Sequence, residues 1–392
     1  MELDSLLAQM IERKASDLHL AAGVPPVFRV DGYLVTARAP KPPLELLDSR
    51  EEQGTRRLRE DQVPNLTPEA LDVLLQTGLP KEKLDEARRG SDFSATLRHD
   101  AQTFRCQVFR ERGCLAAAIR AIPDRIPTLE ELHLPPVFER LTDSKRGLIL
   151  LVGPTGSGKM TTLVSMVDHI NRTRSERIYT VEDPMQYVLP SKLSLVTQRV
   201  VGEDVESYER GLRSVMDADP DVVLIGELRT PETARSALEM AESGHLIFSQ
   251  MTAETVADAL ARLLELLGEP RDTAQRLLAR TMQAVIAQRL LPRDSLTGRV
   301  AANEILIGTP RVRQMIADRQ TDPSLLALAM ESSPQVGMQT MDDALLGLYA
   351  ARIISREAAE SYLKDKGRLE PTPPRAASPP ETGGGGGSER RS

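Results

Sequence analysis

The chain has 392 residues, and at roughly 150 residues per domain this length predicts two or three domains. Its net charge of −7 excludes a global basic surface for nucleic acid, and no apolar run reaches the ~20 residues of a membrane-spanning helix. Two cysteines, Cys106 and Cys114, are too few for a disulfide framework or a zinc site. We therefore expect a soluble protein of the cytoplasm that binds no nucleic acid and has no membrane anchor of its own.

The N-terminal part of the chain, up to about residue 125, predicts a small mixed domain. Residues 27–35 form two apolar runs around Asp31-Gly32, a pair typical of a tight hairpin turn. The polar, proline-containing stretch 39–64 predicts a mobile insertion, and 65–125 predict a helix followed by antiparallel strands. A further helix precedes the hairpin, since four apolar residues recur at helical spacing: Leu6, Leu7, Met10 and Ile11.

Residues 126–365 change to an α/β pattern. Short apolar runs, each typical of a strand buried on both faces, alternate with helical stretches and lie at 147–152, 178–181, 222–225 and 246–248. This alternation predicts a parallel sheet with right-handed crossovers. From about residue 262 we expect mostly helix, with Thr340 and Ser355 as helix caps, and the Pro/Gly-rich stretch 366–392 predicts a disordered tail.

The most specific motif is a glycine-rich segment directly after the first of these runs. It consists of Gly153, Pro154, Thr155, Gly156, Ser157, Gly158 and Lys159, and a helix-like segment follows it. Consecutive backbone N–H groups in such a turn, together with a helix N-terminus, cradle phosphates, and Lys159 would reach the β- and γ-phosphates. The alternative is an ordinary glycine-rich turn. It is disfavoured because the predicted strand, the glycine-rich segment and the lysine follow one another at the spacing of a phosphate-binding motif.

The residue after Lys159 departs from the phosphate-binding pattern. That pattern has Ser or Thr there, whose hydroxyl binds Mg²⁺, whereas this chain has Met160. A thioether is a soft ligand and Mg²⁺ is a hard cation, so Met160 cannot take that role. Thr161 follows, but one residue along a helix is a rotation of about 100°, so a water is the alternative occupant. We therefore expect nucleotide binding with weakened turnover.

Acidic residues follow two of the apolar runs. Glu182 and Asp183 come after the second run, and Glu227 comes after the third. Because the C-terminal ends of parallel strands meet at the edge where ligands bind, we expect these carboxylates beside the phosphate loop. One carboxylate can hold the metal, directly or through water, and another can orient the attacking water. Acidic loops that face solvent are the alternative for either cluster taken alone.

The order of these motifs resembles that of the GspE/PulE/PilT secretion-ATPase superfamily, and within it the PilT-like type IV pilus retraction ATPases. The resemblance runs from residue 1 to about 365. Several of its segments are specific to that family, whereas a phosphate-binding loop alone is not. In chain order they are ASDLHL, RVDG, GPTGSGK, VEDP, DPDVVLIGELR, AESGHLIF, NEILIGTP and GMQTMD.

The resemblance implies a hexameric ring in which each subunit has a PAS-like N-terminal domain (1–125) and a RecA-like ATPase domain (126–365), with ATP and Mg²⁺ between them. Carried over residue by residue, it implies nucleotide contacts by the loop 153–159 and by Thr161, Thr162, Arg105, Arg112 and Arg120. A surface salt bridge is the alternative for each arginine. The implied catalytic residues are Glu182 as general base, Glu227 beside the metal, Arg229 and His245.

The resemblance also implies partners for this chain. The chain would form a homo-hexamer, or a mixed hexamer with a paralog. It would also contact an inner-membrane pilus platform protein, through which a cytoplasmic chain becomes peripheral to that membrane.

Five residues depart from the family's pattern: Met160, Asp217, Thr252, Gln186 and Thr230. Asp217 reverses the charge of an expected arginine, and Thr252 replaces the second histidine of the family's histidine box. The implied function is an ATP-hydrolysing motor of pilus retraction and twitching motility. The alternative is a nucleotide-binding, catalytically weak paralog that regulates an active pilus ATPase. An assembly or secretion ATPase of the same superfamily is disfavoured by the compact N-terminal region and by the lack of a cysteine-based metal site.

Overall fold

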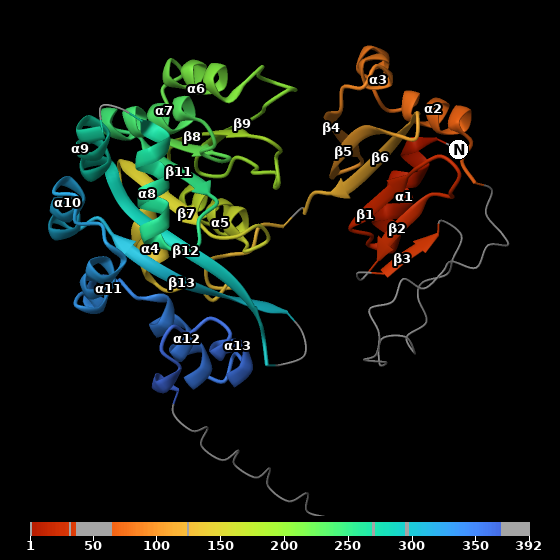
Figure 1. Ribbon diagram of the computed structural model, residues 1–392. Coiled ribbons are helices and arrows are strands. Elements are labelled where there is room, and N and C mark those ends of the chain that lie inside the picture. The colour runs from red at the N-terminus through yellow and green to blue at the C-terminus, as the bar shows by residue number, and fades with distance from the viewer. Residues whose placement is uncertain are drawn as a thin grey trace, which may run out of the picture.

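The structure is a computed structural model that describes residues 2–30, 33–36, 65–123, 125–268, 271–294 and 298–369. Figure 1 shows two parts, each built around its own β-sheet and joined by one stretch of chain. The predicted turn at Asp31-Gly32 and the insertion 39–64 lie outside the described residues, as does the predicted tail from residue 370. No helix within the described ranges has the length and apolar character needed to cross a bilayer.

The described residues of the N-terminal part form three helices and six strands: α1 (Leu3–Arg13), β1 (Asp17–Leu20), β2 (Val27–Val30), β3 (Tyr33–Thr36), α2 (Pro68–Gln76), α3 (Lys81–Arg88), β4 (Phe93–His99), β5 (Gln102–Glu111) and β6 (Cys114–Ala121). The strands make one antiparallel sheet in the order β3-β2-β1-β6-β5-β4. The helices and one face of the sheet share a core that includes Leu6, Leu71, Leu84 and Phe104. The predicted first helix, strand pair and antiparallel β5–β6 pair are confirmed.

A seven-stranded sheet organises the second part. Its strands are β7 (Gly147–Val152), β8 (Arg177–Glu182), β9 (Leu195–Val200), β10 (Val222–Ile225), β11 (Leu246–Met251), β12 (Met282–Pro292) and β13 (Arg299–Ile307). Their order is β13-β12-β7-β11-β10-β8-β9, and all neighbours are parallel except β12 and β13. The predicted α/β class and the four predicted parallel strands are confirmed.

Helices cover both faces of this sheet. They are α4 (Val137–Thr142), α5 (Lys159–Thr173), α6 (Tyr208–Met216), α7 (Pro231–Ser243), α8 (Val256–Leu267) and α9 (Arg271–Thr281). Successive residues of β7 enter opposite cores: Leu148 and Leu150 pack with α7 and α8, whereas Ile149 and Leu151 pack with α4 and α5. Burial on both faces explains why the strand reads as one continuous apolar run.

The prediction of a mostly helical chain from about residue 262 is wrong for residues 282–307. Here β12 pairs with β7 and β13 adds an antiparallel edge. Ala284–Ala287 is a short apolar run, and periodicity alone does not distinguish a buried strand from a buried helix in such a run. The free edge of β7 decides the outcome, because β12 satisfies its backbone groups.

Short helices complete the described chain: α10 (Pro310–Ala317), α11 (Pro323–Glu331), η2 (Pro334–Val336), α12 (Met341–Ala350), α13 (Arg356–Glu360) and η3 (Lys366–Arg368). Thr340 caps α12 through a reciprocal hydrogen-bond pair with Asp343, and the Ser355 side chain caps α13, as predicted. Leu369 is buried among these helices, so the prediction of a disordered tail is wrong for residues 366–369.

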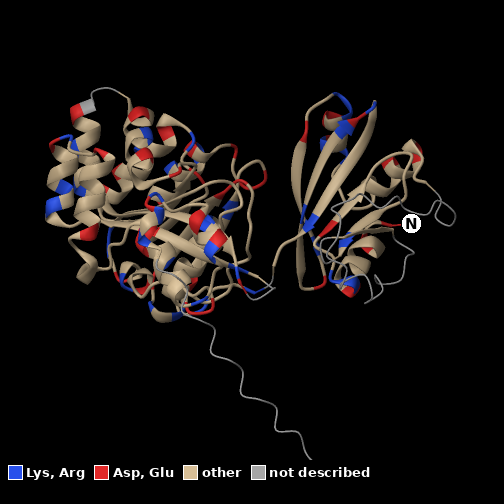
Figure 2. Cartoon of the chain, turned by 60° about the horizontal axis from the view of Figure 1, so that its bottom comes forward, with Lys and Arg blue, Asp and Glu red and all other residues tan. Residues whose placement is uncertain are grey.

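The two parts meet at a small contact near the ends of β8 and β9. The Thr96 hydroxyl lies 2.9 Å from an oxygen of Glu203, and Ile122, Met185 and Val200 form a separate apolar cluster. These contacts show that the N-terminal sheet approaches the same end of the second sheet at which β8 terminates. Over both parts, basic and acidic residues are interspersed (Figure 2).

Candidate functional site

The glycine-rich loop connects the C-terminal end of β7 to the N-terminus of α5. Gly153, Gly156 and Gly158 have φ values of +151°, +80° and +82°, a region that favours glycine. A Cβ atom on Gly153 would overlap the carbonyl oxygen of Gln288 on β12. The sequence therefore folds locally into a turn whose backbone approaches β12 closely and leaves the α5 N-terminus free for a ligand.

Lys159, the first residue of α5, folds back over this loop. Its Nζ atom donates to the carbonyl oxygens of Gly153 at 2.7 Å and Pro154 at 2.9 Å. Burial lowers the pKa of Lys159, while the nearby Glu227 carboxylate raises it. The lysine is thus a partly desolvated cation at the loop, held by two carbonyl oxygens and attracted by Glu227.

The hydroxyl groups around the loop face different ways. Thr161 lines the depression described below, with its hydroxyl 3.1 Å from that of Tyr187. Thr162 instead donates to Oε1 of Gln288 at 3.0 Å and is buried, so the structure does not direct its hydroxyl at the predicted nucleotide. The Ser157 hydroxyl is buried and has no hydrogen-bond partner within the described part of the chain.

An open depression of about 390 Å³ separates the loop from the acidic strand ends. The loop residues 155–161 form one wall, and Asp183, Gln186, Glu227 and Thr252 lie along the other. Oε2 of Glu227 lies 2.8 Å from Nε of Arg229, and the Thr252 hydroxyl donates to Oε1 at 3.3 Å. The hydrogen bond with Glu227 raises the pKa of Arg229. The structure therefore brings Lys159, Thr161, Glu227 and Arg229 together, as predicted.

Glu182, the predicted general base, lies at the end of β8 just behind this wall. Its Oε1 atom accepts hydrogen bonds from Thr180 at 2.8 Å and Gln198 at 3.2 Å. Oε2 is buried and has no partner among the described residues. Burial raises the pKa of Glu182, and the hydrogen bond from Thr180 opposes that shift. Its next residue, Asp183, forms part of the lining, so the carboxyl lies beside the depression without opening into it.

His245 is not brought to this site. It precedes β11, and its carbonyl oxygen accepts from the N–H of Gly147, the first residue of β7. The loop follows the last residue of β7, and a six-residue strand spans about 20 Å. The Nδ1 atom of His245 lies 2.9 Å from the Met240 carbonyl oxygen, at the opposite edge of the sheet.

The structure places the three predicted arginines at different positions in the N-terminal part. Arg105 and Arg120 are cross-strand partners in β5 and β6, whereas Arg112 lies in the turn at the far end of that hairpin. Nε of Arg120 donates to Asp17 at 2.8 Å. Arg105 is half-buried, its Nε has no partner in the described chain, and burial lowers its pKa against the attraction of Asp183. Asp183 of the acidic loop therefore attracts Arg105.

The structure accounts for three of the departures from the family's pattern. Met160 is 5% exposed and belongs to the apolar cluster around α5, so its thioether fills space where a hydroxyl was expected. Thr230 caps α7 in a reciprocal pair with Thr233. Thr252 contacts Glu227. Asp217, by contrast, is exposed at the end of α6 and lines no part of the depression.

The residues present fit a nucleotide phosphate. Three features surround one helix N-terminus: a buried hydroxyl with no hydrogen-bond partner among the described residues, a glycine, Gly153, with no room for a Cβ atom, and a lysine held by carbonyl oxygens. The described residues contain no group of three or more His, Cys, Asp or Glu placed to hold a metal ion. Glu227 offers one carboxylate. That donor set suits Mg²⁺, which is commonly held by one or two carboxylates plus phosphate oxygens and waters.

Sequence reasoning missed three residues of the site. Gln288 lies under the loop, and Tyr187 contacts Thr161. Tyr208 fills the space between the ends of β8 and β10, where its hydroxyl would overlap a Cβ on Gly226, and burial raises its pKa. Tyr187 could have been found from its position after the acidic segment. Gln288 and Tyr208 carry no local signal, because only the tertiary fold brings them here.

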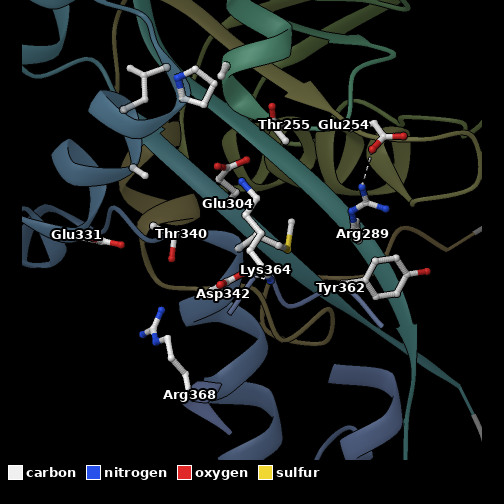
Figure 3. Close-up of a pocket in the computed structure, with 15 residues that line it drawn as sticks. Glu254, Thr255, Arg289, Glu304, Glu331, Thr340, Asp342, Tyr362, Lys364 and Arg368 are labelled. Carbon is white, nitrogen blue, oxygen red and sulfur yellow. Dashed lines mark hydrogen bonds and ion pairs between the residues drawn. The ribbon is translucent and has the colours of Figure 1, made fainter. Parts of the chain in front are cut away.

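A second, smaller cavity of about 160 Å³ lies between β12, β13 and the C-terminal helices (Figure 3). Many of its polar groups are already paired. Arg289 lies 3.3 Å from Glu254 and over the Tyr362 ring, and Oε2 of Glu304 accepts from the N–H of Val256. Asp342 accepts from the backbone N–H groups of residues 364 and 365. These contacts fasten the C-terminal helices to the sheet.

Known proteins resemble this chain over most of its length. The family described as "Type II/IV secretion system protein" matches residues 89–356. The "Type IV pilus retractation ATPase PilT" of Pseudomonas aeruginosa is 38% identical over 366 residues, which are 93% of this chain and 98% of that protein. The "Type IV pilus ATPase PilU" of the same organism is 34% identical over 360 residues, 92% of this chain and 88% of that protein. The crystal structure of the pilus retraction motor PilT with bound ADP has a TM-score of 0.79 at 34% identity, covering 94% of this chain and 99% of that one.

Proposed function

This chain belongs to the family of Type II/IV secretion system proteins, and on that premise we propose that it is an ATP-binding and ATP-hydrolysing motor of the type IV pilus retraction type. One observation carries the proposal: the phosphate-type loop with Lys159 faces Glu227 across a single depression at the C-terminal edge of a parallel sheet. The 38% identity to a pilus retraction ATPase over nearly the whole chain supports the assignment to pilus retraction.

The proposed roles follow from the positions of the side chains. The loop N–H groups and the α5 N-terminus bind the phosphates of ATP. Lys159 exchanges the carbonyl oxygens of Gly153 and Pro154 for phosphate oxygens, which are stronger partners for an ammonium group. We assign Glu182 as the general base, a role that suits a carboxylate of raised pKa. Because its carboxyl is closed off from the depression in this structure, it would accept a proton from the attacking water only once the site rearranges to expose it. Glu227 would hold Mg²⁺ directly or through water, and the bound ion would supply neutralisation of the phosphate charge.

The proposal extends to assembly and partners. We infer a hexamer of this chain, or a mixed hexamer with a paralog, that acts on an inner-membrane pilus platform protein from the cytoplasmic side. Within one chain, Arg105 of the N-terminal part is attracted to Asp183, and it would reach phosphates if the two parts close. We propose that Thr162 acts through Gln288, to which its hydroxyl donates. Arg112 is proposed to contact the nucleotide in the assembled ring.

A second candidate function is favoured by Met160. Because this side chain is packed in an apolar cluster, no hydroxyl occupies the position that usually binds Mg²⁺. A nucleotide-binding, catalytically weak paralog that regulates an active pilus ATPase is therefore the alternative. The chain is also similar to a second pilus ATPase, PilU, at 34% identity.

One experiment separates these readings. Steady-state ATP turnover with Mg²⁺ is measured for the wild-type chain, Lys159→Ala and Met160→Ser, and nucleotide binding is recorded on the same samples. Turnover of the wild type well above that of Lys159→Ala supports the motor. If the wild type binds ATP but is as slow as Lys159→Ala, the motor is contradicted and the regulatory paralog is the better account.

A further inference from the structure

We propose that Gln288 is a positioning residue that orients the Gly158 N–H toward the phosphates; the proposal rests on the nucleotide site described above. Gln288 lies on β12, directly beneath the loop, and is 1% exposed. Its side chain contacts the loop on one side and α5 on the other. The residue has no part in the phosphate-loop motif, since it is 129 positions beyond Lys159 in the sequence.

Three contacts connect Gln288 to the loop and α5. Its Nε2 atom donates to the Ser157 carbonyl oxygen at 2.8 Å, and its Oε1 atom accepts from the Thr162 hydroxyl at 3.0 Å. Its backbone carbonyl oxygen fills the space where Gly153 has no Cβ atom. The beginning of the loop, its end and the first turn of α5 are therefore all fixed to one residue of β12.

The hydrogen bond from Gln288 to the Ser157 carbonyl oxygen also fixes the direction of the Gly158 N–H, because both groups belong to one peptide bond. In a trans peptide the C=O of one residue and the N–H of the next point in opposite directions. The Ser157 carbonyl oxygen points at Gln288, so the Gly158 N–H points away from β12. Gly158 lines the depression. The donation from Gln288 therefore holds this N–H toward the ligand side, in the class of backbone donors that cradle α- and β-phosphates.

The chemistry requires an amide at this position. A carbonyl oxygen only accepts, so Ser157 needs the NH₂ end of Gln288, and the Thr162 hydroxyl then donates to the oxygen end. A glutamate could still accept from Thr162 but could not donate to Ser157 when ionised, and it would place a negative charge under the phosphates. A leucine would leave the Ser157 carbonyl without a buried partner.

The test compares the affinities of ADP and AMP, because loss of a β-phosphate donor changes their ratio whereas a general loosening of the fold weakens both. The full chain is used, with competition against a fluorescent ADP analogue and denaturant unfolding of each variant. We expect Gln288→Leu and Gln288→Glu to bind ADP roughly 10–100-fold more weakly, the range for one hydrogen bond to a charged group, with AMP affected less. Thr162→Val keeps the donation to Ser157 and is expected to lose less than about 10-fold.

Gln283→Leu is the matched control, because Gln283 is an amide of the same strand that donates to Arg146 away from the loop. Wild-type affinity for ADP in a cooperatively folded Gln288→Leu or Gln288→Glu would overturn the proposal, as would an equal loss for ADP and AMP. If Gln288→Leu does not fold, the ADP and AMP affinities of Gln288→Glu and Thr162→Val test the proposal instead. A wild-type chain that binds no ADP contradicts the proposed function itself, a result distinct from failure of the Gln288 variants alone.

Discussion

The Nε atom of Arg229 lies 2.8 Å from the Oε2 atom of Glu227, so the carboxylate proposed to hold Mg²⁺ is paired with a guanidinium two residues along the chain. The Arg229 side chain is 64% exposed and that of Glu227 is 19% exposed. A partly exposed pair of this kind contributes little to stability and is screened by salt. The ion pair therefore orients Glu227, and breaking it would lose little stability, so Glu227 remains available to a divalent cation that arrives with a nucleotide.

Replacing Glu227 by glutamine tests this role. Glu227→Gln keeps the side-chain size but removes the charge, so we expect ATP turnover to fall about 100-fold or more while ADP affinity changes only a few-fold. Steady-state ATPase rates and fluorescent ADP titrations measure the two effects. Glu239→Gln, at an exposed position of α7, is the control. Unchanged turnover in Glu227→Gln would exclude Glu227 from the metal site.

Met160 permits a test that separates packing from metal binding. Because Met160 is 5% exposed and packed in the apolar cluster around α5, both Met160→Ser and Met160→Ala are expected to lose about 2–4 kcal/mol of unfolding free energy. Only serine supplies a hydroxyl, so we expect Mg²⁺-dependent turnover of Met160→Ser to exceed that of Met160→Ala by roughly 10-fold. Urea unfolding and ATPase rates check both parts. Equal turnover in the two variants would mean that the hydroxyl position does not limit the reaction.

Much of the fold follows from local pattern, and the exceptions have a common cause. The apolar runs of β7, β8, β10 and β11 are predictable because strands buried on both faces need apolar residues at every position. β12 has a similar run, yet it was expected to lie in a helical region. Its structure depends on pairing with residues of β7 that lie 134 or 135 positions earlier in the sequence. The apolar run alone does not distinguish a strand from a buried helix, and the long-range pairing that decides between them leaves no local signal.

The site residues also divide into those that a local pattern predicts and those that only the tertiary fold brings to the site. Lys159 and Glu227 were predictable, because each follows an apolar run and the C-terminal ends of parallel strands share one edge. His245 could have been excluded by the same rule, since it precedes its strand and therefore lies at the other edge. Gln288 was not predictable, because its contact with Ser157 joins a loop to a strand that is distant in the sequence.

The buried carboxyl of Glu182 predicts a pH dependence of stability. Burial raises its pKa in the folded chain above the unfolded value, so between the two values the folded chain binds more protons. The contribution of Glu182 to stability is therefore fully present below the unfolded pKa and is lost as pH rises through the folded pKa. Glu182→Gln is neutral at every pH, and we expect it to gain stability relative to the wild type as pH rises from about 4, near the unfolded value of a glutamate, through the raised pKa of the folded chain.

Urea unfolding of both proteins across that pH range measures this difference, and ATP turnover at pH 8 is expected to fall in Glu182→Gln if the carboxylate is the base. Glu239→Gln serves again as the exposed control, for which the difference from the wild type should not vary with pH. Parallel pH curves for the wild type and Glu182→Gln would contradict the raised pKa.

Two glycines of the loop provide a matched pair that tests its close approach to β12. Both have positive φ, but a Cβ atom on Gly156 meets no atom within 4 Å, whereas one on Gly153 overlaps the Gln288 carbonyl oxygen and contacts the Ser157 hydroxyl. We expect Gly156→Ala to lose about 1–2 kcal/mol of unfolding free energy from backbone strain alone. Gly153→Ala is expected to lose about 2–4 kcal/mol and to bind ADP more weakly than Gly156→Ala, because the loop must move away from β12. Urea unfolding and ADP titration of the two variants measure the difference, and equal losses would mean that the loop does not depend on its contact with β12.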